Sequence, residues 1–445
     1  MFGKLLSVAV STVIINGALD AGTPARSEQD IRELLNSARG VSPALCTLAA
    51  DGLFSWGGRW SAPAEAVTSD IRSRLHRRRT ERLTADESRT LVEGLASPDA
   101  CERHLAATMV GRFEDSTIVS RLVPRLTAGA APEREATLIA LGLLGAKSQV
   151  EPIVRALRDE SAGVRANAAW ALGRVGQRDV APALYATLRD GDARVRAASA
   201  VSLGHLHAAD SIDVLVRVLR TDPSPEVRRV AAWALGELRD RAIAPALMQA
   251  LASDKSDEVR EMAAWALAES NAREAVDALI ASVKGDESAS VRETSAWALA
   301  ELNARRAIDA LAEVVTNDKE PEVRGTAAWA IGQMHPGKAP SGLVKAIRDA
   351  DSEVRLKAAW ALSEIGDPDV SNAIADALKT ETKERVQQAE VRALMRTGDE
   401  SADVFRKLLE SKDAQTREMA VRALAGRKNY GPWPWPWPRP RPFPN

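Results

Sequence analysis

The side chains that most often ligate metals or act as nucleophiles are few in this sequence and lie far apart. Five histidines occur among 445 residues, and only His205 and His207 are close together. Residues two positions apart lie on different faces of a helix, so these two imidazoles do not converge on one ligand. The sequence contains neither a G-x-S-x-G elbow nor a G-x-x-x-x-G-K-S/T loop. It therefore predicts no metal, no cofactor and no catalytic residue.

The two cysteines, Cys46 and Cys101, form no C-x-x-C pair, which argues against a zinc site and against a disulfide scaffold. One structural disulfide and two free buried thiols are both compatible with the sequence. Free cysteines are among the most buried residue types, so two buried free thiols are the favoured interpretation.

Charge is balanced over the whole chain, with 60 lysines and arginines against 61 aspartates and glutamates. No global field therefore attracts the protein to nucleic acid or to an anionic membrane. Residues 71–82 hold six arginines, but no aromatic residue is interleaved, which favours a solvated helix or linker. We expect a protein partner and no nucleic acid.

The residues that do recur are an arginine, an aspartate and a tryptophan at a fixed period. A Val-Arg pair occurs seven times at intervals of 31 or 32 residues, from Val164-Arg165 to Val354-Arg355. An aspartate stands five positions before each of these valines: Asp159, Asp190, Asp222, Asp254, Asp286, Asp318 and Asp349. A tryptophan stands six positions after the valine, except where Val201 replaces it: Trp170, Trp233, Trp265, Trp297, Trp329 and Trp360.

Four weaker copies extend this series, since Arg103, Arg134, Gln387 and Arg417 stand where the repeat arginine stands. The repeat region thus runs over about residues 84–428. Self-similarity at such a period is typical of a solenoid, because one unit cannot bury its apolar face alone and stacked neighbours share a continuous core.

Each unit reads as two helices. In the copy around Val259, apolar residues over 259–270 follow the i, i+4, i+7, i+8, i+11 spacing of one helical face. A break at Asn271 separates them from a second apolar set over 275–283. The aspartate ahead of each first helix is suited to accept hydrogen bonds from free backbone N–H groups there.

Segments such as Pro225-Glu-Val-Arg-Arg-Val-Ala-Ala-Trp-Ala-Leu-Gly236 resemble the HEAT-like repeats first named from phycobiliprotein (PBS) lyases. The resemblance implies an all-α fold, a right-handed α-solenoid (an armadillo-like, HEAT superhelix) of about eleven helical hairpins. It also implies that each repeat arginine reaches an aspartate of an adjoining turn, which fixes the register between repeats by charge-assisted hydrogen bonds. We therefore interpret the arginines and aspartates as structural.

The repeat tryptophan lies at roughly 240° on the helical wheel, away from the core positions of its own hairpin. Packing against the neighbouring repeat is the favoured interpretation, because it buries most of a large aromatic ring without any partner. The alternative is a partly exposed aromatic stripe that binds a partner.

Two segments precede the repeats. Residues 1–25 include an apolar stretch, 5–15, that is typical of a signal peptide, and an apolar N-terminal helix is the alternative. A signal peptide would place the protein in the periplasm or outside the cell, and its absence would place it in the cytoplasm. Residues 26–83 are interpreted as a capping and linker region, with short helices over 30–38 and 44–50 and a Gly- and Trp-rich loop over 52–60.

The tail, residues 429–445, has proline at every second position from Pro432. This alternation excludes helix and sheet and predicts a polyproline II rod without fixed tertiary structure. Prolines three apart do not occur, which excludes an ordinary P-x-x-P ligand. The candidate partner-binding residues are Trp433, Trp435, Trp437, Arg439, Arg441 and Phe443. Contact with a membrane interface and an inert spacer are the alternatives.

The likeness to HEAT-repeat enzymes leaves a catalytic alternative. Deoxyhypusine hydroxylases of this type bind two irons through His-Glu pairs, and this chain contains no His-Glu dipeptide. Bilin lyases are more similar, but no reactive constellation is present here. The sequence favours a non-catalytic protein-binding scaffold or adaptor of a bacterial cell envelope. The alternative is a bilin-lyase-like or other HEAT-repeat enzyme, lyase or oxidoreductase, acting on a partner protein.

Overall fold

The computed structural model describes residues 24–40, 82–113 and 115–397, together with positions 406, 409, 410, 414, 417, 418, 420 and 421. All regular structure in these residues is helical, as the sequence predicts. The chain divides into two compact units, 1–146 and 147–445, and this division falls inside the predicted repeat region.

In the first unit, α4 (Ala85–Leu95) and α5 (Ala100–Phe113) pack on each other. The helices that accompany them are α1 (Pro24–Ser37), η1 (Ser116–Ile118), α6 (Val119–Leu122), α7 (Arg125–Ala128) and α8 (Ala131–Leu143). The helix predicted over 30–38 is therefore longer at its N-terminal end. Thr84 caps α4 with a reciprocal pair of hydrogen bonds to Glu87.

The expectation of two free thiols is wrong, because Cys101 is disulfide-bonded. Cys46 is the sequence's other cysteine and lies outside the described residues. Spacing alone did not distinguish a single bridge from two buried thiols.

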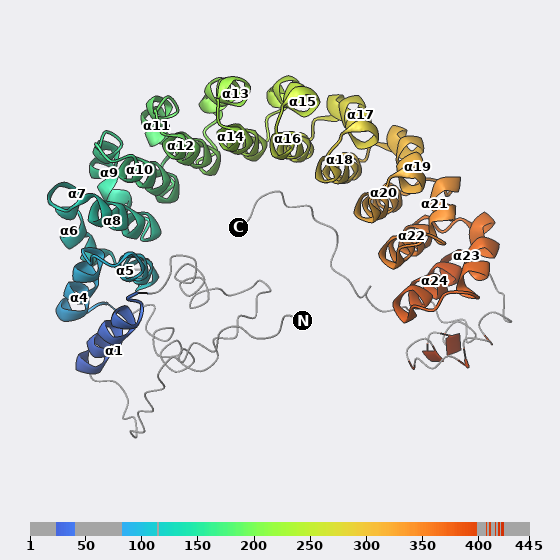
Figure 1. The fold of residues 1–445 in the computed structure, drawn as a ribbon, viewed down its shortest axis with the longest axis horizontal. Coiled ribbons are helices and arrows are strands. Elements are labelled where there is room, and N and C mark those ends of the chain that lie inside the picture. The colour runs from blue at the N-terminus through green and yellow to red at the C-terminus, as the bar shows by residue number, and fades with distance from the viewer. Residues whose placement is uncertain are drawn as a thin grey trace, which may run out of the picture. The chain divides into compact units, whose positions relative to one another are not determined.

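The second unit, in its described part, has an inner and an outer layer of helices (Figure 1). The inner layer holds α10 (Ala162–Val175), α12 (Ala193–His205), α14 (Pro225–Leu238), α16 (Asp257–Glu269), α18 (Ala289–Glu301), α20 (Pro321–Gln333), α22 (Ser352–Ile365) and α24 (Glu384–Thr397). The outer layer holds α9 (Val150–Ala156), α11 (Ala181–Thr187), α13 (Ile212–Thr221), α15 (Ala244–Ser253), α17 (Val276–Gly285), α19 (Ile308–Asn317), α21 (Ser341–Ala346) and α23 (Ser371–Leu378). Every outer helix except α21 follows a 3-10 turn: Lys147–Gln149, Arg178–Val180, Ala209–Ser211, Arg241–Ile243, Arg273–Ala275, Arg305–Ala307 and Pro368–Val370.

Each hairpin turns at the residue twelve positions after the repeat valine, and that residue has a positive φ. In the copy around Val259 it is Asn271, with φ of 51°, at the predicted break. The other copies place Gly176, His207, Arg239, Asn303, His335 and Gly366 there. Glycine and asparagine suit this left-handed conformation, whereas histidine and arginine adopt it under the constraint of the packed helices on both sides.

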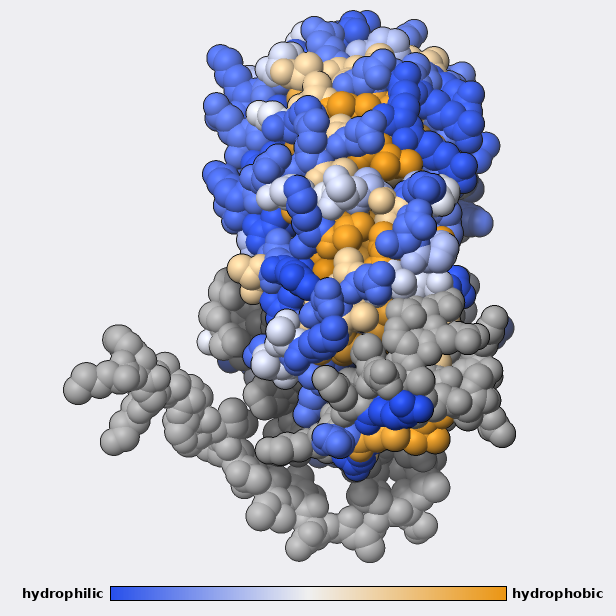
Figure 2. Space-filling model, turned by 90° about the vertical axis from the view of Figure 1, so that its right-hand side faces the viewer, coloured by the Kyte–Doolittle hydropathy of each residue, from blue (hydrophilic) through white to orange (hydrophobic). Residues whose placement is uncertain are grey.

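The core lies between the layers. All seven repeat valines are fully buried, and so are the leucine or isoleucine residues that follow at the eighth position. Figure 2 shows the side of the molecule that carries α19, α21 and α23, where hydrophilic residues cover most of the surface around a narrow apolar column. Among the described residues, the exposed large apolar side chains are Leu409 and Val421.

Several predicted segments lie outside the described residues. These are the apolar stretch 5–15, the helix over 44–50, the loop over 52–60, most of the basic stretch 71–82 and the whole tail 429–445. None of the described helices is long and apolar enough to cross a membrane.

Candidate functional site

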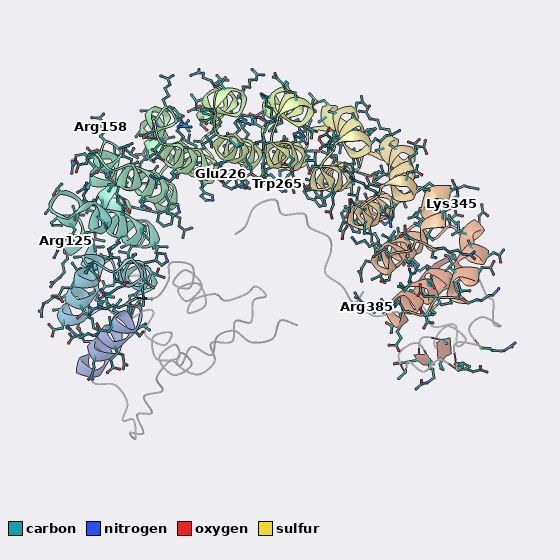
Figure 3. All side chains as sticks on the ribbon, viewed as in Figure 1. Arg125, Arg158, Glu226, Trp265, Lys345 and Arg385 are labelled. Carbon is teal, nitrogen blue, oxygen red and sulfur yellow. The ribbon has the colours of Figure 1, made fainter. Side chains whose placement is uncertain are left out.

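The inner helices expose one face, and the repeat assigns four positions to it. Relative to the repeat valine, positions −1, +2, +6 and +10 fall within about 80° of one another on the helical wheel, at 100° per residue. Figure 3 shows Glu226, at position −1, and Trp265, at position +6, on the inner side of the row. Arg158 and Lys345 lie on the outer side. We call the surface formed by these four positions on α14, α16, α18, α20 and α22 the inner face.

The repeat arginines do not contribute to this face, because they form a ladder that joins consecutive repeats. Arg260 donates from Nε and Nη2 to both carboxylate oxygens of Asp286, at 2.8 and 2.9 Å. Its Nη1 donates at 2.9 Å to the backbone carbonyl of Asp254 in its own repeat. The same pairing joins Arg165–Asp190, Arg196–Asp222, Arg228–Asp254, Arg292–Asp318, Arg324–Asp349 and Arg355–Glu381.

The aspartates of the ladder have a second role, as predicted. Asp254 accepts a hydrogen bond at 2.9 Å from the backbone N–H of Ser256, which begins the turn into α16. Hydrogen bonds from Arg165 hold the pKa of Asp190 below its ordinary value. Because both partners of each rung are engaged and largely buried, the ladder is structural and offers no free group to a ligand.

Three of the six tryptophans are buried and three are half-buried. Trp297, Trp329 and Trp360 retain 7, 2 and 1% of their exposure, whereas Trp170, Trp233 and Trp265 remain partly accessible. The rings pack on the preceding repeat, where a Cβ atom at Gly236 would lie 2.8 Å from Cζ3 of Trp265. The aromatic stripe is thus mainly a packing device whose N-terminal members keep exposed edges.

The residue at position +10 of one repeat lies beside the tryptophan of the next. The rings of His205 and Trp233 meet edge to face, with centroids 5.1 Å apart. Burial lowers the pKa of His205, so the imidazole is neutral near pH 7. The same offset of 28 residues pairs Glu237 with Trp265, Glu269 with Trp297 and Glu301 with Trp329. From this offset we expect the glutamates of α14, α16 and α18 to lie near the indole rings of α16, α18 and α20.

The inner face is acidic. Positions −1, +2 and +10 of its five helices hold ten glutamates: Glu226, Glu237, Glu258, Glu261, Glu269, Glu293, Glu301, Glu322, Glu353 and Glu364. At these positions Arg229 is the one cation. The equivalent positions of α10 and α12 hold Arg174, Arg194 and His205 and no acid. The negative potential is therefore confined to α14 through α22.

Some of these glutamates are held by the neighbouring helix. The hydroxyls of Thr294 and Thr326 donate to Oε1 of Glu261 and Glu293, at 3.3 and 2.9 Å. Burial raises the pKa of Glu261. On α22, the stem of Lys357 lies over Gly325, and burial lowers the pKa of its ammonium group. Hydrogen-bonded, partly buried carboxylates form a preorganised surface, because their rotamers are fixed before any partner arrives.

Two hollows on the second unit lie away from this face, along the ladder. One, of about 640 Å³, is lined by residues that include Tyr185, Arg217 and Asp222, and the other, of about 460 Å³, by residues that include Gln249 and Asp254. Their aspartates belong to ladder rungs. Within the part of the chain that the structure describes, no three His, Cys, Asp or Glu side chains gather as a metal site would require.

Sequence reasoning missed the acidic inner face. The signal was available, because glutamate recurs at the positions that flank tryptophan on the helical wheel. It is hidden in the overall charge balance, because the basic residues that compensate these glutamates lie elsewhere in the sequence. The six tail residues from Trp433 to Phe443 lie outside the described residues, so their predicted role as a partner-binding site stays a prediction.

Comparison with known proteins agrees with this architecture. The family model described as HEAT repeats matches residues 119–204, 182–261, 212–300, 244–332 and 308–395, which is more than half of the chain. No curated protein sequence matches the chain.

Solved structures with a similar fold include two nuclear-import receptors. Kap95p, in its complex with RanGDP, has a TM-score of 0.56 and 12% identity, covering 91% of this chain and 66% of its own. Importin beta has a TM-score of 0.52 and 15% identity, covering 91% of this chain and 69% of its own. The complex of CpcE and CpcF of phycocyanin lyase from Nostoc has 22% identity over 62% of this chain and 93% of its own, with a TM-score of 0.28. The likeness to the import receptors shows the fold.

Proposed function

Because the chain belongs to the HEAT-repeat family, we propose that it is a non-catalytic protein-binding scaffold whose inner face holds a basic segment of a partner protein. The observation that carries the proposal is that ten glutamates and five of the six repeat tryptophans share one face of five consecutive inner helices. Arginine and lysine side chains pair with carboxylates, and guanidinium groups also stack on indole rings.

The scale of the surface fits this role. Adjacent packed helices lie about 8 to 10 Å apart, so five inner helices extend over roughly 32 to 40 Å. An extended partner segment of about ten to twelve residues spans that distance. Of the two importin-like structures, that of Kap95p is a complex with another protein, RanGDP. This complex supports a protein ligand for the present chain as well.

The proposal is tested by affinity capture with matched variants of the full chain. In the inner-face variant, Glu258→Gln, Glu322→Gln and Glu353→Gln remove three exposed charges from α16, α20 and α22. In the outer-face control, Asp213→Asn, Asp277→Asn and Asp309→Asn remove three exposed charges from α13, α17 and α19. We expect the parent and the control to retain the same partner and the inner-face variant to lose it. Retention by all three proteins contradicts the proposal.

We further propose that the protein works in the periplasm or outside the cell. The apolar stretch 5–15 is typical of a signal peptide, and the disulfide at Cys101 is suited to an oxidising compartment. N-terminal sequencing of the mature protein tests this, and an intact Met1 in the cytosolic fraction contradicts it.

A further inference from the structure

We propose that the tail of this chain, residues 432–444, binds in cis to the inner face, so that a partner must displace it. The proposal rests on the proposed function, because it requires that the inner face be a binding surface. The tail would occupy the inner face in the free protein, and a partner would compete with the tail for this face.

Charge complementarity selects this occupant. After Glu418 the sequence contains no acidic residue, and it carries Arg422, Arg427, Lys428, Arg439 and Arg441. The inner face holds ten glutamates. Arg229, Arg239 and Arg385 form ion pairs with Glu226, Glu269 and Glu353, and the Lys357 ammonium lies near Glu293, Glu322 and Glu353. Acidic groups therefore still outnumber these four cations. The most cationic stretch of the C-terminal region and the most acidic face of the repeats therefore belong to one chain.

The aromatic residues of the tail and of the inner face also favour binding of the tail to this face. Three tryptophans and one phenylalanine in the tail meet a face where Trp233 and Trp265 keep accessible edges. Proline rings also pack well on indoles. The apolar contacts favour binding of an alternating Pro-Trp sequence over a merely basic peptide.

The lengths match. A polyproline II segment rises about 3.1 Å per residue, so residues 432–444 extend over about 40 Å. That is the upper end of the roughly 32 to 40 Å spanned by α14 to α22 at 8 to 10 Å per helix. The tail is long enough to contact all five helices of the inner face, and it does not extend far beyond them.

The side-chain periods also agree. Polyproline II has three residues per turn, so positions six apart lie on the same side, about 19 Å apart. This places Trp433 in line with Arg439, and Trp435 in line with Arg441. About 19 Å corresponds to two inner helices. One side of the rod therefore presents an aromatic ring and a guanidinium group at a multiple of the repeat spacing.

The tether makes occupation in cis favourable. Ten residues lie between Val421 and Pro432, and the eleven Cα–Cα steps that join these two positions can extend about 36 Å. A linker of this size gives an effective concentration in the millimolar range. Even a weak contact between tail and face is therefore occupied in the free protein, and a basic partner competes with it.

The test uses full-length proteins and a fluorescein-labelled synthetic peptide of residues 430–445, followed by fluorescence anisotropy. In the tail variant, Trp433→Ala, Trp435→Ala, Trp437→Ala, Arg439→Ser and Arg441→Ser vacate the inner face. We expect this variant to bind the peptide at least tenfold more tightly than the parent does, because the parent's own tail competes. Adding Glu258→Gln, Glu322→Gln and Glu353→Gln to the tail variant should weaken binding at least tenfold. Adding Asp213→Asn, Asp277→Asn and Asp309→Asn instead should change it less than twofold.

Each other outcome overturns the proposal. Absence of peptide binding to the tail variant, or equal binding by parent and tail variant, excludes occupation in cis. Peptide binding that is unchanged by the three inner-face substitutions would show that the tail binds outside the inner face. A parent that dimerises by light scattering, while the tail variant stays monomeric, assigns the tail to a second copy. Tail-dependent co-sedimentation with phosphatidylserine vesicles, unchanged by the inner-face substitutions, assigns it to a membrane. Capture of a partner by the tail variant separates these failures from failure of the proposed function, since that capture does not need the tail.

Discussion

Arg260 and Asp286 stand 26 residues apart in the sequence and are joined by two parallel hydrogen bonds of 2.9 and 2.8 Å. Each belongs to a different repeat, and the arginine also binds the backbone of its own repeat. One side chain therefore fixes the position of two consecutive hairpins. Repeated seven times, this contact couples the described repeats of the second unit.

We predict that Arg260→Ala destabilises the second unit by about 2 to 4 kcal/mol, because it leaves the largely buried carboxylate of Asp286 without its partner. The control is Arg306→Ala, which removes an exposed pair with Asp277 and should cost less than about 1 kcal/mol. Urea unfolding followed by circular dichroism measures both. Equal effects of the two substitutions would show that the ladder does not couple the repeats.

The contact between glycine and tryptophan predicts a steric penalty. Gly236→Ala places a Cβ atom 2.8 Å from Trp265 Cζ3 and 3.0 Å from Ala266 Cβ, so the inner helices must separate. Overpacking of this kind costs about 1 to 3 kcal/mol. Gly285→Ala is the control, because its Cβ meets no atom within 4 Å. A shift in thermal midpoint for Gly236→Ala alone, with a change in tryptophan fluorescence, is the expected result. Two unchanged midpoints would mean that the rings do not pack as described.

Glu390 on α24 predicts a pH dependence of stability. Burial, followed by the nearby charge of Glu381, raises the pKa of Glu390 to about 8, and neither carboxylate oxygen has a hydrogen-bond partner among the described residues. A raised pKa means that the folded state keeps a proton that the unfolded state releases above its ordinary pKa of about 4.3. Stability from this group is therefore lost as the pH rises from about 4 to 8.

We accordingly expect Glu390→Gln to be more stable than the parent at pH 8, by about 1 to 3 kcal/mol, and nearly equal to it at pH 4.5. Glu384→Gln, on an exposed residue of the same helix, should have no effect at either pH. Thermal midpoints across this pH range, with hydrogen exchange of α24, provide the measurement. A Glu390→Gln protein with the same pH profile as the parent would contradict the burial of an unpaired carboxyl group.

The disulfide of Cys101 predicts a reduction-sensitive first unit. A native disulfide contributes about 2 to 5 kcal/mol, in part by restricting the unfolded chain. Alkylation of the denatured, unreduced protein should modify no cysteine, and dithiothreitol should accelerate hydrogen exchange in α4 and α5 more than in α16. Two alkylated cysteines in protein isolated under oxidising conditions would contradict the bridge.

Much of the second unit was predictable from the sequence, because each recurring residue of the repeat has one structural role. Valine at the hairpin core, aspartate at the turn and arginine between repeats are local signals that recur in all seven strong copies. The disulfide was not predictable, because the pairing of Cys101 depends on chain positions that no periodicity specifies. The acidic inner face was overlooked because it appears only after the repeats are aligned and read by helical position. Burial of the tryptophans depends on how closely neighbouring helices approach, as at Gly236 beside Trp265, and sequence spacing alone does not reveal this distance.

The most direct test of the central claim is hydrogen exchange of the tail variant with and without its captured partner. We predict slower exchange in the inner helices from α14 to α22, with little change in the outer helices α13 to α21, and loss of this protection when Glu258, Glu322 and Glu353 are replaced by glutamine. Protection confined to the outer layer, or bilin turnover by the purified protein without any partner, would contradict a scaffold that binds through its inner face.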